Sequence, residues 1–130
     1  MKDIRSRNDI ELLVNDFYKK ALKDEKIGFI FTDIVQLNWK THIPIICDFW
    51  ESVLLDNIKY KGNPILKHIA LNKKINLKKE HFERWLMLWQ KSVQRNFAGK
   101  IADEAIKKAN MMGNLMRYKI EKSNDAGFIQ

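Results

Sequence analysis

Between residues 9 and 23 the hydrophobic positions recur at steps of three and four, namely at Ile10, Leu13, Val14, Phe17, Tyr18, Ala21 and Leu22. This spacing puts them on one face of an α-helix, which we expect to run from about Asp9 to Lys23. Asn8 is its predicted N-cap, and Glu11 three residues later completes a capping box. Tyr18 falls on the buried face, where its hydroxyl needs a hydrogen-bond partner.

A second helix is predicted to begin at residue 39 or 42 and to end near 55. Pro44 decides between the two starts, because a proline inside a helix removes one backbone hydrogen bond but is tolerated in the first turn. If Thr41 is the cap, Pro44 lies in that first turn. The pattern alone leaves both starts open.

Two more long helices are expected, from about Leu77 to Phe97 with Asn76 as the cap, and from about Lys100 to Lys119. Gly113 inside the last of them indicates close packing against a neighbour. The chain has only five glycines and two prolines and no recurrent alternation of period two. We therefore predict an all-α fold, with one domain over residues 1–130 and a core at about 9–120.

The stretch NPILKHIAL at residues 63–71 is the exception to these long patterns. Asn63 followed by Pro64 is typical of a helix start, and LNKKIN closes the segment after about two turns. His68 lies there alone among apolar side chains, which more often means a core histidine than a ligand. A single imidazole does suit haem iron, whose in-plane ligands come from the macrocycle. The four tryptophans could then line a pocket for that flat group.

The charge balance leaves a second class of function open. With 24 basic and 16 acidic residues the net charge is +8, which favours acidic partners such as nucleic acid, anionic lipid or a charged cofactor, although solubility alone could explain it. From Lys59 to Arg84 there are eight basic and two acidic residues. A basic helical nucleic-acid-binding or regulatory domain without haem is therefore the alternative. No predicted helix concentrates these charges on one face, which counts against it.

The other candidate features are weak. Cys47 is the single cysteine, so an internal disulfide is excluded, and His42 lies five positions away, which points the two side chains in different directions on one helix. No apolar window reaches the length of about 18 residues that a membrane span needs. The N-terminus lacks the apolar run of a signal peptide. We expect a soluble, cytoplasmic protein with no membrane partner.

Four separated stretches match one family in order and approximate spacing: DFYKKALKDEKIGFIF (16–31), NWKTHIPIICDFW (38–50), YKGNPILKHIAL (60–71) and FERWLMLW (82–89). The sequence resembles the truncated haemoglobins, and most closely their group III, over about residues 10–120. The resemblance implies a short globin in which four main helices sandwich the haem two on two.

The resemblance also implies roles for individual residues. His68 would be the proximal ligand of haem b (iron protoporphyrin IX), and the distal side would be lined by Tyr18, His42, Trp85 and Ile46. Basic or hydroxyl groups should meet the haem propionates, and the candidates close to these motifs are Lys59, Tyr60, Lys67 and Arg84.

Two distal hydrogen-bond donors would retain a bound diatomic gas strongly, which suits chemistry on nitric oxide or peroxide, or ligand sensing, better than oxygen delivery. An unidentified reductase is then a candidate partner, nucleic acid is not, and a monomer is expected. Whether the protein is an enzyme stays open.

Overall fold

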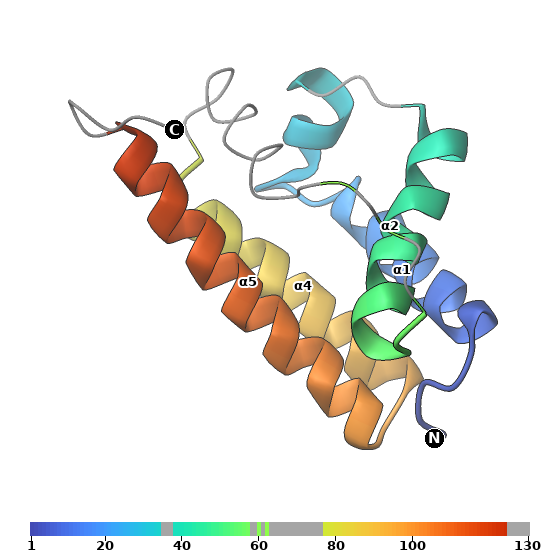
Figure 1. Cartoon of the computed structure of the whole chain (residues 1–130). Helices are drawn as coiled ribbons and strands as arrows, with labels where there is room; N and C mark the ends of the chain where they lie inside the picture. Colours follow the sequence, from blue (N-terminus) through green and yellow to red (C-terminus); the bar gives the residue numbers. More distant parts are fainter. Residues whose placement is uncertain (35–37, 58–59, 61, 63–76, 125–130) are drawn as a thin grey trace.

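The computed structural model describes residues 1–34, 38–57, 60, 62 and 77–124. These residues form the long helices α1 (Arg7–Ala21), α2 (Trp39–Leu54), α4 (Lys79–Asn96) and α5 (Lys100–Asn124), with the short π-helical element η1 (Ile30–Ile34) between α1 and α2. Helices α4 and α5 lie side by side and antiparallel, and α1 and α2 lie across from them (Figure 1). Since no strand occurs in these ranges, the all-α prediction is confirmed.

The start of α1 differs from the prediction. The N-cap is Ser6, whose hydroxyl accepts a hydrogen bond from the Asp9 N–H at 3.4 Å, so the predicted cap, Asn8, is wrong. The Asp9 carboxylate in turn accepts the Arg5 N–H at 2.8 Å. Because the two side chains satisfy backbone donors on either side of the cap, they move the helix start to Arg7, two residues before the predicted one.

The start of α2 resolves the alternatives for Pro44. Asn38 is the N-cap, and its side chain accepts the Lys40 N–H at 3.1 Å, so Thr41 is not the cap. Pro44 therefore lies inside the helix. Its carbonyl accepts a hydrogen bond from Arg7 Nη2 at 3.3 Å, which ties α2 to the first turn of α1 at this point.

Helix α4 begins at Lys79, and its N-cap is Lys78 instead of the predicted Asn76. The Lys78 N–H donates to Nδ1 of His81 at 2.9 Å. His81 is half-buried and takes part in this helix start.

Helix α5 extends to Asn124, beyond the predicted end at Lys119. Its first turn is capped from far along the chain, because the Asp3 carboxylate accepts the N–H groups of Ile101 at 2.9 Å and Ala102 at 2.8 Å. Gly99 precedes this turn with a φ of +140°, and a Cβ there would lie 2.5 Å from Asp3 Cγ. Only glycine fits both the backbone conformation and the close approach of Asp3.

The core lies where α1 packs against α2 and α4, and where α4 packs against α5. Every predicted inner-face position of α1 from Ile10 to Ala21 is buried. Trp89 of α4 is 1% exposed, and its indole N–H donates to the Ala105 carbonyl at 3.1 Å. A Cβ on Gly113 would lie 3.3 Å from Leu86 Cδ1, so the close helix packing predicted for this glycine is confirmed.

Candidate functional site

An aromatic cluster surrounds Tyr18 at the end of α1. Its ring centroid lies 5.1 Å from that of Trp39 and 6.4 Å from that of His42, both on α2, and 5.6 Å from that of Phe31 in η1. Trp39 and His42 also meet edge to face at 5.3 Å. The structure thus brings together Tyr18 and His42, two of the residues predicted for the distal side. It adds Phe31 and Trp39 to them.

The Tyr18 hydroxyl is a polar group within this aromatic cluster. The residue is 8% exposed, yet within the described part of the chain its hydroxyl makes no hydrogen bond. No fully enclosed side-chain nitrogen or oxygen of the described residues lacks a partner. The hydroxyl must therefore border open space. Burial raises the pKa of this phenol above its ordinary value, and the neighbouring Cys47 contributes, so Tyr18 stays a protonated donor at neutral pH.

Trp85 on α4 reaches the same region through Phe17. The Phe17 ring lies 4.9 Å from Tyr18 and 5.3 Å from Trp85, edge to face in both contacts. Trp85 is half-buried, and among the described residues its indole N–H makes no hydrogen bond, in contrast to Trp89. Two donors that lack a protein partner in the described ranges therefore flank Phe17. Each of them can donate one hydrogen bond to a small polar ligand.

No family model matches the chain. A search of curated proteins finds the group 3 truncated hemoglobin Ctb of Campylobacter jejuni, 30% identical over 112 residues, which are 84% of this chain and 86% of that protein. The chain belongs to the group III truncated haemoglobins. The crystal structure of the group III truncated hemoglobin from Campylobacter jejuni matches with a TM-score of 0.81 and 28% identity, over 96% of this chain and 99% of that one. The predicted family and its globin fold are confirmed, which favours a globin over a nucleic-acid-binding domain.

This truncated haemoglobin has further predicted site residues that the structure describes only in part. His68, Lys67 and Lys59 lie outside the described residues. Ile46, one turn after His42, is half-buried against the core. These positions leave the predicted roles untested.

The two described candidates for the propionates are already engaged in the protein. The Tyr60 ring meets Phe49 edge to face at 5.2 Å, and its N–H donates to Ser52 Oγ at 3.0 Å. Arg84 binds Asp24 through Nε at 2.8 Å and through Nη2 at 2.6 Å. Only Nη1 of Arg84 lacks a carboxylate in these contacts, and it lies 4.0 Å from Met87 Sδ.

Cys47 lies on α2 with no exposed surface. Burial raises the pKa of its thiol to about 11, and the nearby carboxylates add to this, although the charge of Arg7 opposes it. A thiol with this pKa is protonated at neutral pH and is a poor nucleophile. The catalytic pairing of Cys47 with His42, already disfavoured by their spacing, has no support here.

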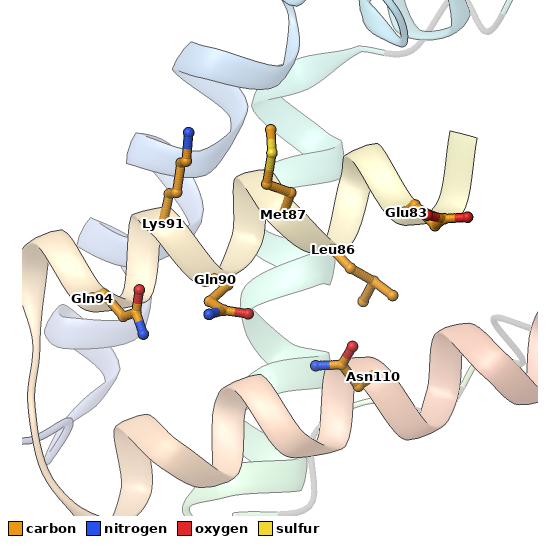
Figure 2. Close-up of a pocket in the computed structure, with 7 residues that line it drawn as sticks. All are labelled: Glu83, Leu86, Met87, Gln90, Lys91, Gln94 and Asn110. Atoms are coloured by element: carbon orange, nitrogen blue, oxygen red, sulfur yellow. The ribbon is translucent and has the colours of Figure 1, made fainter. Parts of the chain in front are cut away.

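The groove that the described residues form between α4 and α5 is separate from the aromatic cluster. Figure 2 shows Leu86, Gln90 and Gln94 of α4 along it, with Asn110 of α5 opposite. Neither Tyr18, His42 nor Trp85 lines this groove.

Among the described residues no helix is long and apolar enough to cross a membrane.

A cluster around Arg7 was missed entirely by the sequence reading. Arg7 Nη1 lies 2.6 Å from Asp48 Oδ1 and 2.9 Å from Glu51 Oε1 of α2, and Nε lies 3.2 Å from Glu11 Oε2. The hydrogen bond with Asp48 is the main reason that the pKa of Arg7 is raised. The partners on α2 stand 41 and 44 positions away in the chain, so no local pattern could have revealed them.

Proposed function

We propose that this truncated haemoglobin binds one haem b and acts on a diatomic ligand held on its distal side. The observation that carries the proposal is the pair of donors, the Tyr18 hydroxyl and the Trp85 indole N–H, that have no protein partner in the described ranges. Buried donors normally find partners within the protein. In a member of this family, a polar ligand on the haem would be the partner of these donors.

His68 would hold the iron through Nε2, which requires the neutral imidazole, while Nδ1–H would donate to a backbone acceptor such as the Pro64 carbonyl. When bound, the haem supplies a reversible site for a gas and a redox centre. Tyr60, Lys67 and Arg84 remain the proposed contacts of the propionates. For Arg84 this contact would use Nη1 beside the ion pair with Asp24.

On the distal side, the chain's own side chains would act as hydrogen-bond donors to the bound ligand. Each donor to a partly charged ligand is worth about 1.5–3 kcal/mol, which corresponds to a roughly 10- to 100-fold slower escape. His42 and Ile46 would border the same space and limit the access of water. Slow escape suits oxidation of nitric oxide, activation of peroxide or ligand sensing better than oxygen delivery. We also propose a cytoplasmic monomer that receives electrons from an unidentified reductase.

The test is the absorbance of the purified protein after reconstitution with haem. A Soret band with one haem per chain is expected, and His68→Gly should strongly reduce haem retention. His81→Gln is the matched control, because this histidine belongs to the start of α4, and it should keep its haem. A native protein without a Soret band would refute the function, and an unchanged spectrum in His68→Gly would remove His68 as the ligand.

A further inference from the structure

Three of the four tryptophans form a continuous stack in the interior. Trp85 and Trp89 stand one turn apart on α4, with ring centroids 5.9 Å apart and an interplanar angle of 7°. Trp50 of α2 lies against Trp89 at 4.5 Å and 18°. Trp89 is therefore stacked on two indole rings, whereas Trp85 and Trp50 are each stacked on one. Most aromatic contacts among the described residues are edge to face, so this parallel arrangement is distinct.

The surroundings of Trp89 favour an indole that has lost an electron. A cation is stabilised over the face of a tryptophan, and Trp89 has two such faces. Its N–H donates to the Ala105 carbonyl, a bond that strengthens when the donor becomes charged. A carbonyl oxygen is too weak a base to take the proton, and with 1% exposure Trp89 has no access to water that could take it. An oxidised Trp89 would thus keep its proton.

One end of the stack borders the candidate site. Trp85 is half-buried, and its indole N–H makes no hydrogen bond to a described residue. Phe17 touches Tyr18, Trp85 and Trp89, with centroids 4.9, 5.3 and 5.4 Å away. An electron can therefore pass from the enclosed Trp89 through Trp85 to the distal side without leaving packed aromatic rings.

We propose that the Trp85–Trp89–Trp50 stack is an electron donor to the distal side during reduction of a hydroperoxide, and that the oxidised state resides on Trp89 as an indole cation. This inference rests on the proposed haem function. The O–O bond of the hydroperoxide breaks, and two electrons with two protons from solvent give an alcohol, or water from hydrogen peroxide, and one water. One electron comes from the cofactor and one from the stack. A one-electron reductant such as ascorbate then restores both.

The first experiment uses the haem-loaded protein, mixed with one equivalent of hydrogen peroxide and freeze-quenched for electron paramagnetic resonance. A tryptophan radical that narrows with ring-deuterated tryptophan is expected. Trp89→Phe should lower its yield about tenfold, because the site with two indole faces is lost. Trp50→Phe removes one face and leaves the bond to Ala105, so it should lower the yield less. Tyr118→Phe, an exposed oxidisable side chain on α5 outside both the stack and the cluster around Tyr18, is the control and should leave the signal unchanged.

A second experiment needs no haem. Azide radicals from pulse radiolysis oxidise the full-length chain by one electron, and the optical band of the indole cation should persist at neutral pH in the native protein. It should give way to the band of the deprotonated radical in Trp89→Phe. An equal yield in Trp89→Phe, or a radical on Tyr18 alone, would overturn the role of the stack. If the cation band persists in a protein that has no Soret band, the stack is an electron donor and the proposed haem function fails.

Discussion

Arg7 lies at the start of α1 and Tyr18 lies near its end, and these two polar side chains differ in their hydrogen bonding. At its start, Arg7 uses all three guanidinium nitrogens, on three carboxylates and the Pro44 carbonyl. Near its other end, the Tyr18 hydroxyl has no bond within the described residues, although the side chain is more deeply buried than that of Arg7. Saturated polar groups hold helices together. A donor without a protein partner is what the proposed ligand site requires.

The largest effect is expected from a substitution of Arg7, whose guanidinium nitrogens all have partners. Arg7→Met removes the guanidinium from beside Glu51, whose side chain is 4% exposed. Loss of one partner of a buried ion pair should lower the free energy of unfolding by about 3 kcal/mol. Urea unfolding should show a lower midpoint with an unchanged slope.

The control for this variant is Arg95→Met, which breaks the pair with Asp16, where the arginine side chain is 45% exposed. An exposed pair of this kind should cost only about 0.5 kcal/mol. Equal losses in the two variants would mean that the Arg7 cluster is no more than another surface pair.

The next effect is expected from the hydroxyl of Tyr18, which has no partner among the described residues. Tyr18→Phe keeps the ring and removes only the hydroxyl, so the oxygen dissociation rate should rise roughly 10- to 100-fold. Stopped-flow displacement of oxygen by carbon monoxide measures this rate. The free energy of unfolding of the haem-free chain should not fall, because no described protein partner is lost. A stable, fast-releasing native protein that is indifferent to the change would make Tyr18 a structural residue.

A smaller effect is expected from acid, and it should again come from saturated groups. Burial alone would raise the pKa of Asp24. The hydrogen bonds from Arg84 and from the N–H groups of Lys26 and Ile27 lower it by more, so the pKa lies below its ordinary value. A carboxyl with a depressed pKa in the folded state stabilises the fold above about pH 4, and this contribution is lost as the pH falls through the folded-state pKa. The free energy of unfolding should therefore decline between about pH 5 and pH 3. In Asp24→Asn the decline should be shallower, and an identical slope would contradict the assignment.

The last prediction is that pH has no effect on oxygen release in the neutral range. Because burial raises the pKa of Tyr18 above its ordinary value, the phenol keeps its proton throughout the neutral range. The oxygen dissociation rate should be flat between about pH 6 and pH 9. A rate that climbs toward pH 9 in the native protein and stays flat in Tyr18→Phe would show that the phenol ionises.

The inner face of α1 and the all-α fold followed from periodicity, because a buried helical stripe leaves a repeat in the sequence. The caps did not, since S-R-N-D offers several capping side chains in a row and only the three-dimensional bonds choose Ser6. The same holds for Pro44, which the Asn38 cap places inside α2.

For the site, Tyr18, His42 and Trp85 were named from the resemblance. The missing partner of the Tyr18 hydroxyl was contrary to what its burial predicted, and only the packing of the neighbours reveals it. The stack of Trp50 on Trp89 joins two helices, so no spacing in the chain could announce it.

The bond from Asp3 to the first turn of α5 has a consequence for the order in which the protein is made. Asp3 leaves the ribosome early, whereas the N–H groups that it accepts belong to residues 98 and 99 positions later. The Lys2 carbonyl likewise accepts a hydrogen bond from the Ala98 N–H, which is made much later in synthesis. Before that, this segment has local partners, because Lys2 Nζ and the Arg5 N–H both bind the Asp9 carboxylate. Asp3 can bind the turn at Gly99 only after α4 has been made and α5 has begun, so this long-range cap forms late in synthesis.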